Sequence, residues 1–334
     1  MSNRLAGVLA ALPALLLLWY LPALGGLYWW RAQTRYGASG SLDGGPSEAA
    51  ALLNPPDWTA HAAITLVLAA VVLGIALAGT ARRPAFGVLV GLPLTAAGVY
   101  GMLSAQNARD LTGALKVLSL AGGPDVSAGQ LRAGTATYLG QGLCLLVGGT
   151  LLAAALWAQH PPRERRRALP AAGAGLLAML AAWGCLFEAG ARGTGPWLVL
   201  TCVAAFLLGW TAGSGHLPAV APLVCGLPAL VLGLGDVLGR DFLLEIADTV
   251  LPLSPDSGEH VLLLRGSVLA STVPLLILGG ALVVAAAGAL GAPGHRTSRG
   301  AGKGRAARRP QRAAGRNRGR RPQSRPSARA RARS

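Results

Sequence analysis

Long apolar runs with almost no charge alternate with short polar stretches along most of the chain. A transmembrane helix needs about 20 mostly apolar residues, and the apolar residues here fall in blocks of this length rather than in amphipathic patterns. The expected spans are residues 5–30, 61–80, 85–105, 138–158, 169–189, 196–213, 217–236 and 268–290. The first run is too long for a signal peptide and no small-x-small cleavage site follows it, so it is a retained span. The pattern predicts an all-α polytopic membrane protein with eight transmembrane helices.

Composition agrees with this pattern. Apolar residues make up 52% of the 334 residues and charged residues only 13%, about half the charged fraction of an ordinary soluble domain. Only Lys116 and Lys303 are lysines, and the arginine preference amid abundant Ala, Gly and Pro is typical of high-GC bacterial genomes.

Basic residues predict the orientation, because cytoplasmic loops carry an excess of Lys and Arg. An internal N-terminus places Arg4, the Arg82–Arg83 turn, the run RERRR at 163–167 and the basic C-terminal segment on one side. We therefore expect a multi-pass protein of the bacterial cell membrane with both termini in the cytoplasm.

Two 17-residue stretches suggest an internal duplication. RDLTGALKVLSLAGGPD occupies 109–125 and RDFLLEIADTVLPLSPD occupies 240–256. Further matches follow in the same order at offsets of 131 to 135 residues, among them GLP at 91–93 and 226–228 and the Gly-Gly pairs at 148 and 279. They predict two four-helix membrane repeats, 1–160 and 161–293, in parallel orientation about an axis along the membrane normal.

The two matched stretches also predict short amphipathic helices on the outer surface, over 109–120 and 240–250. Charged residues in and near these segments form a candidate outer polar rim for a substrate or partner. Its members are Arg109, Asp110, Asp125, Arg132, Glu188, Arg240, Asp241, Asp256 and Arg265. The favoured alternative is structural, with the acids as helix or turn caps and the arginines as headgroup anchors.

The sequence predicts no metal site, cofactor or catalytic residue. All four cysteines lie in apolar segments without CxxC spacing, and the five histidines lie at span ends, in loops or in residues 294–334. Hydrolase, metalloprotease and nucleotide-binding motifs are lacking.

Residues 294–334 carry 14 arginines, one lysine and no acid, which leaves the rest of the chain nearly neutral within the net charge of +17. A segment without aromatic residues or aliphatic residues larger than alanine is expected to be disordered. It would bind anionic lipids, and nucleic acid only nonspecifically because it offers no stacking platform. The candidate residues of this segment for binding lipids or polyanions are Arg305, Arg308, Arg309, Arg320 and Arg321.

These features favour a non-enzymatic accessory or structural component of a bacterial envelope or transport complex, with a membrane-protein partner. One alternative is a permease or channel with a path between the two repeats, and another is a membrane-surface enzyme that uses outer-face carboxylates. A transport path requires polar groups that line one cavity at mid-depth. The candidates are Thr95, Tyr100, Gln141, Thr150, Thr201, Ser271 and Thr272.

Overall fold

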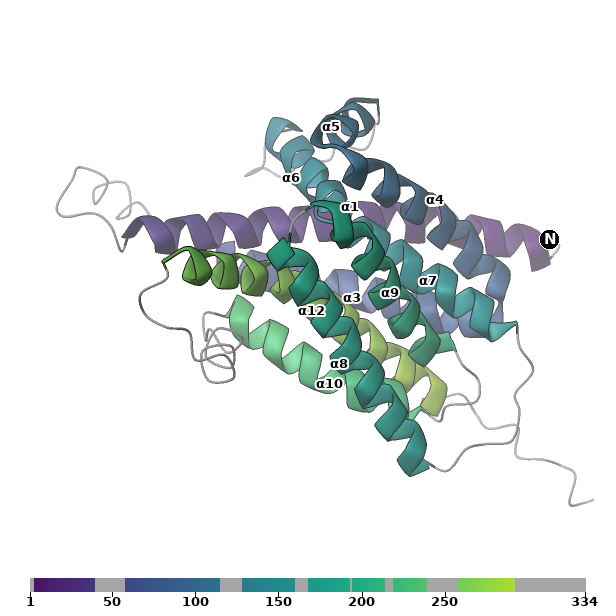
Figure 1. Cartoon of the computed structure of the whole chain (residues 1–334). Helices are drawn as coiled ribbons and strands as arrows, with labels where there is room; N and C mark the ends of the chain where they lie inside the picture. Colours follow the sequence, from purple (N-terminus) through teal and green to yellow (C-terminus); the bar gives the residue numbers. More distant parts are fainter. Residues whose placement is uncertain are drawn as a thin grey trace, which may run out of the picture. The chain divides into compact units, whose positions relative to one another are not determined.

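The computed structural model describes residues 3–39, 58–114, 128–159, 168–192, 194–213, 219–238 and 258–291, and this part of the chain is helical with no strand (Figure 1). The helices are α1 (Asn3–Ser39), α3 (Trp58–Arg82), α4 (Pro84–Leu103), α5 (Ala105–Ala114), α6 (Ala128–Gly140), α7 (Leu143–Ala158), α8 (Ala168–Arg192), α9 (Thr194–Gly213), α10 (Val220–Val237) and α12 (Gly258–Gly291). Helices lie at all eight predicted positions, and the basic segment 294–334 lies outside the described residues.

Five of the described helices contain stretches long and apolar enough to cross a membrane: α1, α3, α4, α10 and α12. The bent pair α6–α7 makes a sixth if it is counted as one span. The apolar stretches found in α8 and α9 are shorter, at Ala172–Leu186 and Leu198–Gly213. The chain is therefore a multi-pass helical membrane protein with five to six candidate spans among the described residues.

Large apolar side chains on the outer surfaces of these helices agree with a lipid environment. Ile64 on α3 is 62% exposed, Leu177 on α8 is 68% exposed and Val199 on α9 is 63% exposed. Lipid tails solvate such side chains without the cost that water would impose.

Local sequence explains how α4 begins and ends. It begins at Pro84, whose missing N–H costs nothing in the first helical turn, directly after the Arg82–Arg83 pair. It ends at Leu103, and the following residue, Ser104, adopts an extended conformation with φ −159° and ψ 151°. The Ser104 hydroxyl then accepts a hydrogen bond of 3.0 Å from the backbone N–H of Asn107 and so caps α5.

This cap changes the predicted surface helix. The helix expected over 109–120 begins at Ala105 instead of Arg109, because Ser104 rather than an aspartate starts it. Residues 115–120 and the second expected helix, 240–250, lie outside the described residues.

The expected fourth span, 138–158, is two helices rather than one. α6 and α7 meet at a bend of 55°, where Gly142 adopts a left-handed backbone with φ 75°. The backbone N–H of Gln141 bonds to the carbonyl of Thr137 at 2.8 Å and closes α6 before the bend. By contrast, α12 in the second half continues from Gly258 to Gly291 past Pro274.

Glycines bring pairs of helices into backbone contact. Between α4 and α7, a Cβ at Gly91 would lie 2.8 Å from the carbonyl oxygen of Gly148. Between α10 and α12, a Cβ at Gly226 would lie 2.6 Å from the carbonyl oxygen of Gly279. Any side chain here would separate the helices, so these small residues set the helix spacing.

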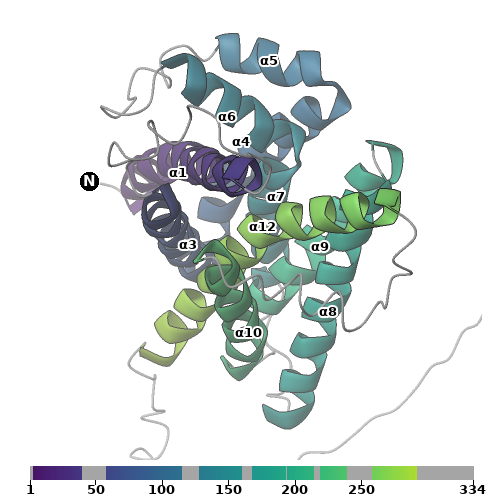
Figure 2. The ribbon, with the colours of Figure 1, turned by 90° about the vertical axis from the view of Figure 1, so that its left-hand side faces the viewer.

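Two further contacts join helices from different halves of the sequence. A Cβ at Gly149 in α7 would lie 2.9 Å from the Cβ of Ala205 in α9, and a Cβ at Gly280 in α12 would lie 2.7 Å from that of Ala70 in α3. Figure 2 shows α12 running between α3 and α9. Contacts are extensive between α3 and α12, and also between α7 and α9.

Candidate functional site

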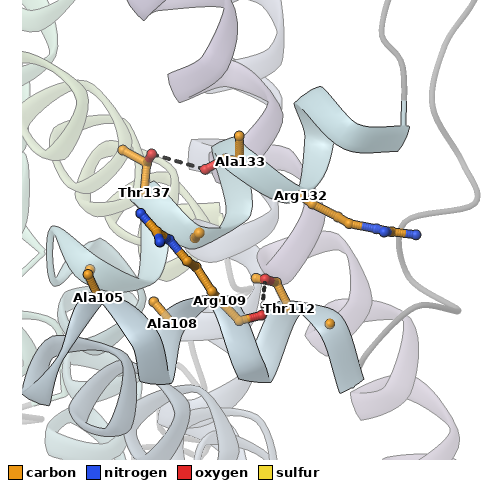
Figure 3. A pocket seen from close by; sticks show the side chains of 10 residues that line it. Ala105, Ala108, Arg109, Thr112, Arg132, Ala133 and Thr137 are labelled. Carbon is orange, nitrogen blue, oxygen red and sulfur yellow. Dashed lines mark hydrogen bonds between the residues drawn. The ribbon is translucent and has the colours of Figure 1, made fainter.

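A cleft of about 660 Å³ lies between α5 and α6 (Figure 3). The two helices contact each other and lie side by side next to α4 in both views of the ribbon (Figures 1 and 2). The residues that line the cleft are Ala105, Ala108, Arg109, Thr112, Gly113, Arg132, Ala133, Ala136, Thr137 and Gly140. Small side chains therefore make most of its walls, and two arginines provide its charge.

Both walls are anchored to the helices around them. The amide Nδ2 of Asn107 donates a hydrogen bond of 3.2 Å to the carbonyl oxygen of Tyr100 and ties α5 to the end of α4. On the α6 side, the Tyr138 hydroxyl donates a 3.0 Å hydrogen bond to the carbonyl oxygen of Leu18, and its ring meets Trp19 edge-on at 6.4 Å. The Asn107 bond fixes α5 against the end of the helix before it, and the buried Tyr138 bond fixes α6 against α1. The two helices that form the cleft are therefore each held in place by the surrounding helices.

The arginines differ in direction. In Figure 3 the guanidinium of Arg109 extends from α5 toward α6, whereas that of Arg132 points away from α5. The hydroxyls of Thr112 and Thr137 donate to backbone carbonyls of their own helices, at 2.8 and 3.0 Å. None of the described residues that line the cleft is acidic, so the arrangement suits an anion and offers no carboxylate for general acid–base work.

The structure brings together part of the predicted polar rim. Arg109 and Arg132 line one cleft, while Asp110 is exposed and its Oδ1 accepts a 2.8 Å hydrogen bond from Gln106 on the same helix. Glu188 lies in α8 and Arg265 in α12, but their side chains are not described. The remaining predicted positions lie outside the described residues: Asp125, Arg240, Asp241, Asp256, Arg305, Arg308, Arg309, Arg320 and Arg321.

A buried polar pair links α10 to α12. Asp236 is 4% exposed and Thr272 is fully buried, and the Thr272 hydroxyl donates a 2.9 Å hydrogen bond to Oδ2 of Asp236. The sequence places Asp236 near the end of a span, but the pairing depends on the register between two helices and has no signal in either segment alone.

The polar residues proposed for a transport path do not line one described cavity. The hydroxyls of Thr95 and Thr150 bond to carbonyls four residues earlier in their own helices, at 2.7 Å each. Tyr100 and Gln141 are exposed, and Thr272 is engaged with Asp236. The side chain of Ser271 is not described.

A small void lies among α8, α9 and α12. Its volume is about 10 Å³, and Met179, Trp183 and Pro274 are among the residues around it. An apolar space of this size is at the lower limit for one water molecule, so it offers no room for a solute.

No metal centre occurs within the described ranges, where no three His, Cys, Asp or Glu residues come together. The cysteines are free thiols, and that of Cys144 donates to the carbonyl oxygen of Leu94 at 3.2 Å. This sulfur therefore belongs to the contact between α4 and α7.

Comparisons of the chain with known protein families, with curated proteins and with solved structures found no match.

Proposed function

We propose that the protein is a non-enzymatic scaffold of the bacterial cell membrane, an accessory or structural subunit of an envelope or transport complex. In this proposal it has eight spans built as two interlocked four-helix repeats, with both termini in the cytoplasm. The main observation in its support is a set of short contacts at glycines, which occur at matching positions in both halves and allow the helices to pack tightly.

The spacing of these contacts supports the repeat. Gly226 follows Gly91 by 135 residues, and Gly279 follows Gly148 by 131 residues. The contact between α4 and α7 thus has a counterpart between α10 and α12, with the same kind of atom, a carbonyl oxygen, nearest to each missing Cβ.

The contacts between halves follow the same two spacings. Ala205 follows Ala70 by 135 residues, and Gly280 follows Gly149 by 131 residues. The α3–α12 contact in one direction therefore corresponds to the α9–α7 contact in the other, as a two-fold relation between parallel repeats requires.

A cluster of aromatic residues supports the proposed position of the membrane interface at one end of α1 and α3. Tyr28 near the end of the apolar part of α1 lies 5.4 Å from Trp58 and 5.6 Å from His61, measured between ring centroids, at the start of α3. Aromatic belts of this kind are enriched where spans leave the hydrocarbon. The Arg82–Arg83 pair marks the other end of α3 and supports a cytoplasmic side there.

The packing of polar groups favours a scaffold over a transporter. Thr95 and Thr150 bond within their own helices, Thr272 pairs with Asp236, and the small void among α8, α9 and α12 is apolar. A path for a polar solute needs groups that replace its water of hydration, and none of the mid-depth polar candidates is among the described residues that line the α5–α6 cleft or this void.

Purification of the full chain from its native membrane in mild detergent tests the proposal. We expect a stoichiometric membrane-protein partner to co-elute and to survive repeated size-exclusion chromatography. Gly226→Val is the matched variant, since it separates α10 from α12 and should release the partner, whereas Gly184→Ala at an open position should not. Elution of the wild-type protein alone, under conditions that keep it folded, would contradict an accessory role.

Asp236 supports a second candidate, a permease or channel, because buried ionisable residues in spans often mark ion paths. Proteoliposomes that contain the purified chain can be assayed for proton and sodium flux with wild type and Asp236→Asn. A flux that Asp236→Asn abolishes would favour the permease over the scaffold.

A further inference from the structure

We propose that the α5–α6 cleft binds the headgroup of an anionic phospholipid, with Arg109 as the principal phosphate ligand. None of the described residues that line this cleft belongs to the basic C-terminal segment. The inference goes beyond the scaffold function, because neither depends on the other.

The position of the cleft places it at the level of lipid headgroups. α4 is a candidate span that ends at Leu103, and α5 begins two residues later at Ala105. The Arg82–Arg83 turn lies at the opposite end of α4. The cleft thus lies where a span leaves the bilayer, on the face away from that turn.

The charges in the cleft select an anion. The described lining residues include two arginines and no acid, and of the two it is the Arg109 guanidinium that extends across the cleft toward α6 (Figure 3). The nearest carboxylate in sequence, Asp110, is exposed and accepts a hydrogen bond from Gln106 instead. A guanidinium binds a phosphate through two parallel N–H donors, which makes it a better headgroup ligand than a lysine of equal charge.

The walls favour a lipid over a soluble phosphate. Ala108 and Thr112 are buried on the α5 side, and Ala133 and Ala136 line the α6 side. A Cβ at Gly113 would meet nothing within 4 Å, so open space adjoins the apolar walls. A volume of about 660 Å³ is within the range of small-molecule pockets and leaves room for the glycerol next to the phosphate.

Native mass spectrometry of the full-length protein in detergent tests the site. The probes are palmitoyl-oleoyl phosphatidylglycerol and the corresponding phosphatidylcholine, each titrated against four proteins: wild type, Arg109→Gln, Gly113→Leu and Arg82→Gln. Arg82→Gln is the matched control, because it removes the same charge from an exposed position at the other end of the span.

We expect Arg109→Gln to weaken phosphatidylglycerol binding about ten-fold, as the loss of a charge-assisted phosphate contact predicts, and to leave phosphatidylcholine binding unchanged. Gly113→Leu keeps both arginines but fills the cleft, and it should weaken phosphatidylglycerol binding to a similar degree. Its melting temperature should match that of wild type, because the new side chain enters open space. Arg82→Gln should bind both lipids as wild type does.

Three results would overturn the inference. Equal loss in Arg109→Gln and Arg82→Gln would assign the lipid to general electrostatics, including the C-terminal segment that all four proteins retain. Unchanged binding in Gly113→Leu would place the lipid outside the cleft. Equal loss of both lipids in Arg109→Gln would show that the cleft does not read the headgroup charge.

Discussion

Glycine residues determine how closely the helices of this protein approach one another. At Gly226 the nearest atom to an added Cβ is a carbonyl oxygen at 2.6 Å, and backbone cannot move aside as a flexible side chain can. Lipid gives apolar helices no hydrophobic drive to associate, so close van der Waals packing stabilises these interfaces.

Substitution of Gly226 by alanine should therefore destabilise the fold by about 1–3 kcal/mol through overpacking. The matched substitution Gly184→Ala, where nothing lies within 4 Å of the added Cβ, should be neutral or slightly stabilising because it favours the helix. Thermal unfolding in detergent measures both. Equal melting temperatures for the two variants would contradict the role of Gly226 in the interface.

The Asp236–Thr272 pair gives a second prediction at single residues. Thr272→Val removes the hydroxyl that donates to a buried carboxylate and should cost about 1–3 kcal/mol, whereas Thr272→Ser retains the donor and should cost less. Unfolding of Thr272→Val, of Asp236→Asn and of the double variant Asp236→Asn/Thr272→Val completes a double-mutant cycle. Additive effects of Asp236→Asn and Thr272→Val would show that the two side chains are not coupled.

Among the helices, the sequence was informative about where each one lies and less so about how it begins or bends. Runs of apolar residues placed α3 and α10 to within a few residues, because the membrane requires their length and composition. The sequence does not predict the break at Gly142, because apolar residues continue on both sides and nothing distinguishes this glycine from the others in a chain that has 47.

Contacts between side chains of different helices are harder to predict from the sequence than the helices themselves. The sequence predicts Arg109 and Arg132 as charged residues near the membrane surface, but their common cleft depends on the Ser104 cap and on the Tyr138 anchor. Asp236 could be recognised as unusual, yet its bond to Thr272 follows only from the register of α10 against α12. The amino-acid sequence predicts which segments are apolar, but it does not predict the register of one helix against another.

The bend between α6 and α7 supplies a prediction for a whole element. Gly142→Ala should destabilise the protein by about 1–3 kcal/mol, because φ is 75° there and the new Cβ would lie 2.8 Å from the sulfur of Met102. Thermal unfolding tests this, with Gly140→Ala as the control, since nothing lies within 4 Å of that position. A more stable Gly142→Ala protein would mean that α6 and α7 form a continuous helix.

For the molecule as a whole, the proposed topology predicts which positions face which side of the membrane. In a background without the native cysteines, a cysteine at Gln106 should react with a membrane-impermeant maleimide added to intact cells. A cysteine at Arg82 should react only after the membrane is permeabilised. The reverse pattern would contradict cytoplasmic termini, and reaction of both in intact cells would contradict a spanning α4.

Paired cysteines can test whether the two repeats interlock reciprocally. In the cysteine-free background, the pairs Ala70→Cys/Gly280→Cys and Gly149→Cys/Ala205→Cys each place Cβ atoms in contact, at 2.7 and 2.9 Å before relaxation. Disulfides need about 3.8 Å, which a small helix displacement provides.

The same four positions provide their own control when the partners are exchanged, as 70 with 149 and 205 with 280. Ala205 is the one described neighbour within 4 Å of a Cβ at Gly149, so the exchanged pair lacks that contact. Mild oxidation in native membranes, read by the mobility shift after protease cleavage between the halves, should cross-link both reciprocal pairs in similar yield and the exchanged pairs poorly. Cross-linking of only one reciprocal pair, or equal yields for exchanged pairs, would contradict the interlocked repeat.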